Sequence, residues 1–543
     1  MTEEPTKPPI LPISGQRNIL ITSTLPYVNN VPHLGNLIGS VLSADVFARF
    51  CRARGINTLY VCVGQQEQTN GTTTETRALQ EGISPKELCD KYHAIHWDIY
   101  KWFNISFDVF GRTTTQLQTS ITHDIILKLL ENGYLDEQIT MQLFCPESQH
   151  TSFLADRFVE GVCPHCAYDS ARGDQCDGCG KLLDPLELAS PRCKLDGVTP
   201  EKRETNYIFL ALDKLQPQIK DFVARSSTDG AWSKNGEDIT NSWLRGGLKP
   251  RSITRDMKWG TPVPSASSLR GYEDKVIYAW FDACIGYISI TATYTPEWER
   301  CLIGTGEEWT KLHHLSTTDY LTYEGGKFSK SREVGVFGDS AKKTGVPSDV
   351  WRYYLLSRRP ENGDAEFNWE SFISANNNIL LKNLGNLVSR VIKFVNSKHC
   401  KGVVPDCTEY KDEDALVKGW KDQFNGLLVG YTAELDAVKL RAGLATALAK
   451  SQKGNAFLQS LNLSNKLAET EPIKCAAVVG FAVNLLHLLV AMVEPFMPKT
   501  AGSICSMLKM ESLGIPDDWS ADSIKPGHAE KAEEWRRLFG GQG

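Results

Sequence analysis

The 543-residue sequence lacks a strong excess of charge, an internal repeat and any low-complexity tract. Its net charge of −6 argues against a histone-like affinity for nucleic acid over the whole surface, although a local basic face stays compatible with it. Residues 1–17 also lack the apolar stretch of a secretory signal, since they are polar and hold four prolines. With an apolar share of 41%, a chain of this length should fold into about three or four domains.

One long apolar run, residues 475–493, raises the question of a membrane span. The run is at the short limit for crossing a bilayer, and it holds Asn484 and His487, which would be costly at mid-depth. Pro495 and Pro498 follow it closely. We therefore expect a buried helix of a helical bundle and no contact with a membrane.

The 15 cysteines are an odd number scattered through the chain, which argues against disulfides and for a reducing, cytoplasmic compartment. Two Cys-x-x-Cys pairs lie nine residues apart, with glycines in and beside them that allow a tight return. Each pair supplies two thiolates from one turn, and four thiolates fill a tetrahedral zinc site, which makes the zinc structural. The alternative is four unrelated buried thiols. The predicted ligands are Cys163, Cys166, Cys176 and Cys179.

The start of the chain has the pattern of a parallel α/β sheet. Residues 18–23 and 59–63 are apolar, β-rich runs that predict strands. Residues 34–52 repeat apolar side chains at helical spacing, and a second helix is expected at residues 85–103. Strand, loop, helix and strand in this order are the opening of a parallel sheet.

From about residue 111 to 265 the sequence changes to a cysteine-rich knuckle and irregular loops, with few helices expected. We interpret this stretch as an insertion, because strand-like sequence resumes at residues 275–281. From residue 349 onward the pattern is mainly helical, and residues 376–401 carry five basic residues and no acidic one. A polar tail is expected from about residue 514.

Two motifs far apart in the chain are suited to phosphate. His33, Gly35 and Asn36 lie where the loop after the first strand enters a helix, and a helix N-terminus with a close-approaching glycine collects anions. Taken alone, His-x-Gly-Asn also fits a solvated loop. Far downstream, two glycines precede a cationic loop, which we call the lysine loop. By itself it also fits a solvated surface segment. Its polar residues are Lys327, Ser329, Lys330 and Ser331.

Together the two motifs resemble the pair of signatures with which class I aminoacyl-tRNA synthetases bind ATP. Five further segments resemble the methionyl-tRNA synthetases of the eukaryotic cytosolic type: residues 24–27, 253–264, 280–287, 323–332 and 383–390. The resemblance covers nearly the whole chain. It implies ATP-dependent ligation of L-methionine to methionine tRNA through a methionyl-adenylate, with Mg²⁺ on the ATP phosphates and zinc in the knuckle. It leaves open whether the chain joins a multi-synthetase complex.

The resemblance also assigns roles to residues. His33, Asn36, Lys327 and Lys330 would stabilise the charge that accumulates on the phosphoryl oxygens, each by about 10²–10³ in rate if placed like an oxyanion-hole donor. No general base is needed, because the methionine carboxylate is already ionised. The ATP-binding set is His33, Gly35, Asn36, Lys327, Ser329, Lys330 and Ser331.

The methionine pocket implied by the resemblance has aromatic walls, which suit a thioether. Trp280 and Tyr287, seven residues apart in an apolar run, fit a core role equally well by composition. The pocket set is Leu25, Tyr27, Arg255, Trp280, Ala283 and Tyr287. Asn386 and Arg390, one helical turn apart, match the residues that read the anticodon, although the family's tryptophan after Gly454-Asn455 is absent.

The implied fold is α/β: a Rossmann-type parallel-sheet catalytic domain with an inserted zinc-knuckle connective domain, followed by an all-α anticodon-binding bundle. The expected boundaries are 1–16 for a flexible tail, 17–111 and 266–340 for the two halves of the catalytic domain, 112–265 for the insertion, 341–375 for a stem-contact region, 376–513 for the anticodon-binding domain and 514–543 for a C-terminal tail.

The sequence departs from the family at two places. The loop 63–71 is longer and lacks the aspartate that balances the substrate ammonium and Arg255, a role for which Glu67 is a candidate. Between residues 300 and 301 the family has a helix, a sheet strand and a pocket histidine that this sequence lacks, so the second half of the catalytic domain is expected to be truncated. The flanks match on both sides, which favours a lost or mis-joined coding segment.

Two other interpretations follow. A chain without that strand can be a catalytically impaired relative that acts only as a tRNA-binding or scaffold protein. A leucine or valine synthetase would need a larger editing insertion than the short, knuckle-bearing one found here.

A second knuckle, present in some relatives, is reduced to Cys145 and Cys193, with Ser148 and Asp196 in place of their partners. His150 is a candidate to replace one of the missing ligands, but we expect Cys145 and Cys193 to be relics of a lost site.

Overall fold

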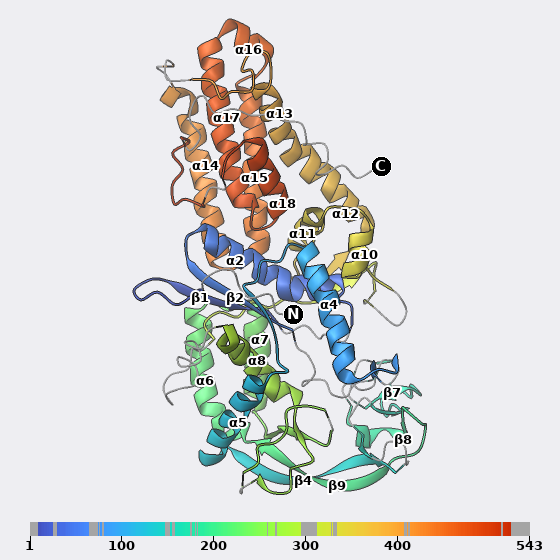
Figure 1. Cartoon of the computed structure of the whole chain (residues 1–543). Helices are drawn as coiled ribbons and strands as arrows, with labels where there is room; N and C mark the ends of the chain where they lie inside the picture. The colour runs from blue at the N-terminus through green and yellow to red at the C-terminus, as the bar shows by residue number, and fades with distance from the viewer. Residues whose placement is uncertain are drawn as a thin grey trace.

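The computed structural model describes residues 9–24, 30–64, 74, 77–78, 81–146, 152–154, 158–173, 176, 178–179, 181, 183–257, 259–266, 269–294, 312–326, 328, 334–406, 410, 413–511 and 514–522. Its shape is elongated (Figure 1). A helical bundle forms one end, a long two-stranded ribbon forms the other, and a small parallel sheet lies between them.

The parallel sheet consists, in the described residues, of β1 (Asn18–Thr22), β2 (Asn57–Gly64) and β3 (Val109–Arg112), in this order. After β1 the chain forms one continuous helix from α1 (Leu34–Leu37) through a π-helical turn (Ile38–Leu42) into α2 (Ser43–Ala53). Both predicted strands and this helix are confirmed.

The second predicted helix is α4 (Pro85–Trp102), and its start is encoded locally. Ser84 accepts a hydrogen bond from the backbone N–H of Glu87, whose carboxylate accepts one from the backbone N–H of Ser84. Pro85 occupies the first helical position, where no backbone donor is lost.

Helix α8 (Ala279–Tyr294) packs on β2 and β3 so closely that a Cβ on Gly111 would lie 2.2 Å from Ile290. Because α8 begins at Ala279, the strand expected at residues 275–281 is wrong in extent. The observed strand β12 covers only Val276–Ile277 and pairs antiparallel with β11 (Thr254–Arg255), outside the parallel sheet. Short apolar runs fit a strand or the start of a buried helix equally well.

Strand β1 is the outer strand of the described sheet, since it pairs with β2 alone. The next described segment after α8 begins at residue 312 and lies against helices α6 (Leu212–Asp229) and α7 (Lys234–Gly246). There the carbonyl of His313 accepts a hydrogen bond from the Trp232 indole (2.9 Å), and the carbonyl of Leu315 accepts one from the backbone of Ser233 (2.9 Å).

The region 112–265 contains more helix than expected, namely α5 (Gln116–Glu131), α6 and α7. The expectation of few helices is wrong because mostly polar, amphipathic helices give a weak apolar signal. A ribbon of β4 (Leu135–Cys145) and β9 (Glu201–Leu210), with short flanking strands β5 (Ser152–Phe153) and β10 (Arg251–Ser252), leads to the knuckle (Figure 1). The knuckle strands are β6 (Val159–Val162), β7 (Ala171–Arg172) and β8 (Ala189–Cys193), with a 3₁₀ turn at Pro185–Glu187.

From residue 321 the chain returns through β13 (Leu321–Tyr323), α10 (Gly338–Lys343), α11 (Ser348–Ser357) and β14 (Ala365–Phe367), which pairs parallel with β13. A continuous helix then runs through α12 (Trp369–Ala375), a π-helical stretch (Asn376–Gly385) and α13 (Asn386–Val395). The bundle is completed by α14 (Glu413–Asp436), α15 (Leu440–Ser460), α16 (Asn465–Thr470), α17 (Pro472–Val493) and α18 (Pro498–Met507).

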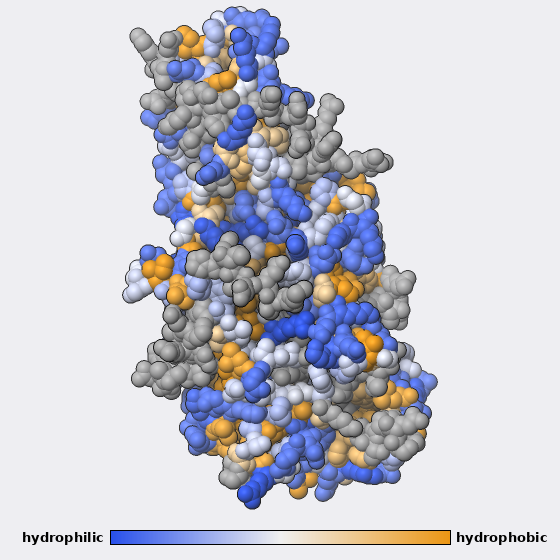
Figure 2. Space-filling model, in the orientation of Figure 1, coloured by the Kyte–Doolittle hydropathy of each residue, from blue (hydrophilic) through white to orange (hydrophobic). Residues whose placement is uncertain are grey.

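Helix α17 contains the long apolar run, and almost all of it is buried in the bundle, as expected for a core helix. A second helical stretch among the described residues, Leu34–Ala53, is also long and apolar enough to cross a membrane by length and composition. More than half of it is buried. On the face drawn in Figure 2 the bundle surface mixes hydrophilic and apolar residues.

The polar tail expected from residue 514 is wrong for its described part, because Ile515 and Trp519 are buried in the core.

A buried ion pair links the sheet region to the bundle. Asp45 on α2 lies 2.8 Å from Arg352 on α11, and both side chains are fully buried. Burial alone would raise the pKa of Asp45, but Arg352, Arg49 and hydrogen bonds from Ser106 hold it below the usual value. Arg352 also donates to the carbonyls of Phe103, Pro495 and Phe496, so one guanidinium holds three segments together.

Candidate functional site

His33 is the N-cap of the helix that follows β1. Its Nδ1 accepts a hydrogen bond from the backbone N–H of Asn36 (3.3 Å), and the Asn36 side chain accepts one from the backbone of His33 (3.2 Å). Because Nδ1 accepts, the neutral ring carries its hydrogen on Nε2, which is therefore a donor. A Cβ on Gly35 would lie 2.9 Å from the imidazole, so glycine is what allows the ring to lie there.

The flanks of the lysine loop lie against the His33 motif. The backbone N–H of Leu34 donates to the carbonyl of Val336 (3.3 Å), and that of Gly338 donates to the carbonyl of Pro32 (2.9 Å). Phe328, inside the loop, stacks on the His33 ring. Lys327, Ser329, Lys330 and Ser331 lie outside the described residues.

Three of the predicted pocket residues share one face of α8. Trp280, Ala283 and Tyr287 follow each other at helical spacing and are partly exposed, whereas Phe281, Ile285 and Ser289 on the other face are buried. We call this partly exposed side of the helix the open face of α8. Leu25, Tyr27 and Glu67 lie outside the described residues.

Arg255 is brought close to Trp280 through Ser252. The Ser252 carbonyl accepts a hydrogen bond from the Trp280 indole (2.8 Å), and its hydroxyl accepts one from the Arg255 guanidinium (2.9 Å). The guanidinium also lies 3.8 Å from the centre of the Tyr278 ring, a cation–π contact that orients it. The structure thus joins the predicted arginine to one wall of the predicted pocket.

Asp282 is a residue that the sequence reasoning missed. It is buried on α8 and accepts hydrogen bonds from Gln118 (2.7 Å), Thr122 (3.0 Å) and Thr261 (3.3 Å). Burial raises the pKa of its carboxyl above the usual value. The bonds from Gln118 and Thr122 fix α8 against α5, which sets the position of the open face. An acid within an otherwise apolar helix was the available signal.

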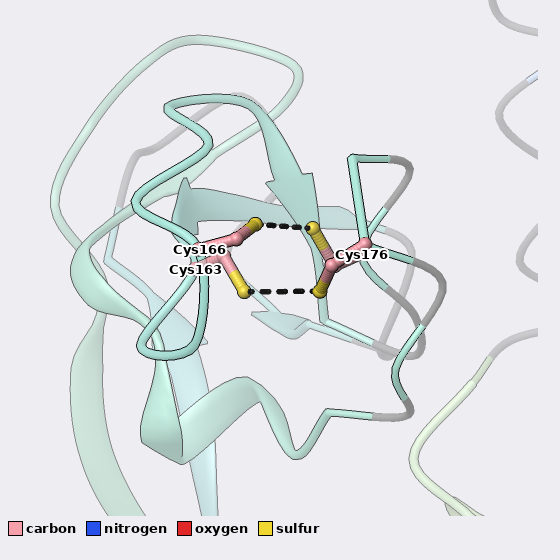
Figure 3. Close-up of side chains that lie close together, drawn as sticks. Cys163, Cys166 and Cys176 are labelled. Atoms are coloured by element: carbon pink, nitrogen blue, oxygen red, sulfur yellow. Dashed lines mark hydrogen bonds between the residues drawn. The ribbon is translucent and has the colours of Figure 1, made fainter.

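The four predicted zinc ligands converge. Their sulfur atoms all lie within 4.8 Å of one another, with 3.9 Å between Cys163 and Cys179 and 3.5 Å between Cys166 and Cys176. Such spacings fit four thiolates on a tetrahedral zinc with bonds of about 2.3 Å. Figure 3 shows the side chains of Cys163, Cys166 and Cys176 turned toward one another.

The knuckle backbone also favours thiolates at this centre. The N–H of His165 donates to the sulfur of Cys163 (3.4 Å), and that of Gly178 donates to the sulfur of Cys176 (3.3 Å). Backbone donors of this kind orient and stabilise metal-bound thiolates. The donor set therefore fits zinc.

Cys145 and Cys193, which we expected to be relics of a second knuckle, lie close together. Together with Asp196 they place three ligand atoms within 4.8 Å of one another, and Cys145 lies 3.3 Å from the Asp196 carboxylate. Ser148 and His150 lie outside the described residues.

The predicted anticodon residues lie together at the start of α13. Asn386 is exposed and donates to the side chain of Asn455 on α15 (3.0 Å), while Arg390 donates to the backbone carbonyl of Asn455 (3.4 Å). A Cβ on Gly454 would lie 2.7 Å from Leu387, so glycine permits the two helices to approach. Lys382, Lys393, Lys398 and Lys401 of the basic stretch are exposed.

The fold and the site define a class I aminoacyl-tRNA synthetase. They combine a parallel sheet whose first helix is capped by the histidine motif, the flanks of a lysine loop against that cap, an inserted knuckle and a C-terminal helical bundle. A family model described as tRNA synthetases class I (M) matches residues 19–302 and 295–392. A second, the anticodon binding domain of methionyl tRNA ligase, matches residues 404–539. The chain belongs to the methionyl-tRNA synthetase family.

Individual relatives agree with this family. The chain is 50% identical to the cytoplasmic methionine–tRNA ligase of Saccharomyces cerevisiae, over 100% of this chain and 76% of the relative. It is 51% identical to a probable cytoplasmic methionine–tRNA ligase of Schizosaccharomyces pombe, over 98% and 72%. The fold is similar to Mycobacterium tuberculosis methionyl-tRNA synthetase bound by methionyl-adenylate, with a TM-score of 0.72, 18% identity and coverage of 95% and 99%.

The comparisons also locate the break that the sequence indicates near residue 300. The family model matches in two parts that meet at residues 295–302. The alignment with the S. cerevisiae relative extends over 584 positions, whereas this chain has 543 residues, so the relative contains sequence that this chain lacks.

Proposed function

We propose that this chain ligates L-methionine to methionine tRNA in two steps at the site around His33. In the first step the methionine carboxylate attacks the α-phosphorus of ATP, a new O–P bond forms, and pyrophosphate leaves with the electrons of the broken bond. In the second step a terminal ribose hydroxyl of tRNA attacks the carbonyl carbon and loses its proton, and AMP leaves. The contact between the His33 cap and the lysine-loop flanks carries this proposal.

The first step is served by fixed donors. The donors would be the Nε2 of His33 and the side-chain amide of Asn36 at the helix N-terminus, together with Lys327 and Lys330. They would stabilise charge on the phosphoryl oxygens without reorganisation during the reaction. Magnesium on the ATP phosphates would neutralise part of their charge.

Methionine would bind against the open face of α8. Trp280 and Tyr287 offer flat rings to the thioether, and Ala283 between them leaves room for the side chain. Arg255, held by Ser252 and Tyr278, places a fixed cation beside this face. Leu25 and Tyr27 would complete the walls.

The remaining parts would handle tRNA and stability. Asn386 and Arg390 would contact splayed anticodon bases and phosphate, and the zinc knuckle would stabilise the insertion. We assign the catalytic domain to residues 17–111 and 266–340, the insertion to 112–265, the stem-contact region to 341–375 and the anticodon-binding domain to 376–513. The names of the relatives favour a cytoplasmic location.

A second candidate function has one observation in its favour. Strand β1 pairs on one side only in the described residues, and the family's sequence is interrupted near residue 300. The resemblance places a further sheet strand of the family at this interruption. A sheet without this further strand would leave backbone donors and acceptors of β1 unpaired. A chain impaired in this way would keep tRNA binding through the bundle without ligating methionine.

Aminoacylation tests the first proposal directly. Transcribed methionine tRNA is incubated with the full chain, ATP and labelled methionine, with leucine and valine as control amino acids. We expect charging with methionine alone, and a His33→Ala variant to charge about 10²–10³ times more slowly. The matched control is His123→Ala, a histidine bonded to the Pro262 carbonyl in the insertion, which should charge normally. Binding of tRNA without charging would select the second candidate.

A further inference from the structure

The ring stacked on His33 belongs to the lysine loop itself. Phe328 lies parallel to the imidazole, with 4.6 Å between ring centres and 6° between planes. On another side, Gly335 approaches the phenyl ring so closely that a Cβ would lie 2.4 Å from it. Gly335 has a φ of +132°, which glycine adopts without strain. The ring of Tyr323 lies 5.7 Å away at a tilt of 47°.

The stack bears directly on the plane of the imidazole. The torsion between Cβ and the ring of histidine has a broad energy minimum. The cap bond from Asn36 to Nδ1, at 3.3 Å, is longer than a typical N–H···acceptor bond. A parallel aromatic partner favours one plane by a factor of about 2 to 10 in population.

The position of Phe328 is itself well determined. The strand before it, β13, is paired with β14, and residues 336–338 after it are bonded to the backbone of the His33 motif. Described segments on both sides of Phe328 are thus anchored, and the phenyl ring itself lies against Gly335 and Tyr323. Neither of these anchors involves the lysines of the loop.

We infer that Phe328 is a positioning residue for adenylate formation: its ring holds the His33 imidazole in one plane, so that the Nε2 donor is oriented before ATP binds. This rests on the proposed function, in which His33 stabilises the phosphoryl oxygens. Misplacement of such a donor slows the chemical step and leaves the binding of methionine unchanged.

The chain contains a matched control. His93 and Phe110 form a second stack of the same geometry, with 4.6 Å between centres and 11° between planes, on α4 and β3. Phe110→Leu removes the same kind of contact outside the predicted site. Phe328→Leu removes the ring of the loop while keeping an apolar side chain, and Phe328→Tyr keeps an aromatic ring.

The first measurement needs no activity. In the full chain with labelled histidine, NMR resonances of the His33 ring are assigned by their loss in His33→Gln. Phe328→Leu should shift the His33 ring resonances and leave those of His93 in place, while Phe110→Leu should do the reverse. If Phe328→Leu leaves the His33 resonances unchanged, the inference is overturned, whatever the chain's activity.

The second measurement is methionine-dependent ATP–pyrophosphate exchange. Phe328→Leu should lower kcat by up to about tenfold with the KM for methionine unchanged, whereas Phe328→Tyr and Phe110→Leu should match the parent chain. A lower KM for ATP with unchanged kcat in Phe328→Leu would show that the ring obstructs ATP and would refute the inference. If the parent chain shows no exchange, the proposed function fails while the NMR result still decides the stack.

Discussion

Lys450 provides a test of how burial controls the stability of the bundle. It lies on α15 with its side chain fully buried, and its ammonium nitrogen has no hydrogen-bond partner among the described residues. Burial lowers the pKa of Lys450 from 10.5 to about 7. The folded chain therefore holds this lysine largely uncharged above pH 7, whereas the unfolded chain keeps it charged up to about pH 10.

The pKa difference gives the size of the effect. A pKa lower by 3.5 corresponds to about 5 kcal/mol, which is the cost that the charge of Lys450 imposes on the folded state well below pH 7. Between pH 7 and 10.5 the unfolded state binds more protons than the folded state, so stability rises with pH by up to about 1.4 kcal/mol per unit. The cost thus falls to about 2 kcal/mol at pH 9.

Replacing Lys450 with methionine removes this cost and keeps a long side chain. We expect the variant to be more stable than the parent chain by about 3 kcal/mol at pH 8, and by more at pH 6. Urea unfolding followed by circular dichroism at pH 6, 8 and 9 measures the difference. Lys453→Met on the same helix is the control, because Lys453 is partly exposed and bonded to Gln423. A Lys450→Met variant that is no more stable, or whose advantage does not shrink as the pH rises, would refute the reasoning.

Four further outcomes are expected. Asp45→Asn should destabilise the chain by about 3–5 kcal/mol in urea unfolding, because it leaves Arg352 buried without its counter-ion. Cys163→Ser should lose the knuckle zinc, measured by metal analysis of the purified chain. Arg390→Ala should weaken methionine tRNA binding by about 1–3 kcal/mol in filter binding and leave ATP–pyrophosphate exchange unchanged. Inserting the S. cerevisiae sequence at the break near residue 300 should raise the thermal unfolding midpoint, because β1 gains a partner; an unchanged midpoint would contradict the importance of the open edge.

The sequence allowed the local features of the fold to be predicted because each depends on residues close in the chain. The strands β1 and β2, the helix beginning at Leu34, and the four zinc ligands all have a periodicity or spacing of their own. The buried helix α17 could be predicted because Asn484 and His487 made a membrane span costly.

Features that depend on distant partners were out of reach of the same reasoning. The stack of Phe328 on His33 joins residues nearly three hundred positions apart, and no local pattern marks it. Residues 514–522 look polar as a segment, yet Ile515 is buried and bonded to Ala53 at the end of α2, and Trp519 is buried against Phe424 and Phe481 of the bundle. At residues 275–281 an apolar run fitted a strand or a helix, and the bonds to Asp282 from α5 accompany the helix that formed.

Methionine-dependent ATP–pyrophosphate exchange on the purified 543-residue chain tests the central claim most directly. The reaction isolates adenylate formation, so it depends on the His33 motif, the lysine loop and the open face of α8, and it does not need tRNA. We predict exchange that requires methionine and is absent with leucine or valine. No exchange from a folded, zinc-containing chain would contradict the claim and leave a tRNA-binding relative of the synthetases.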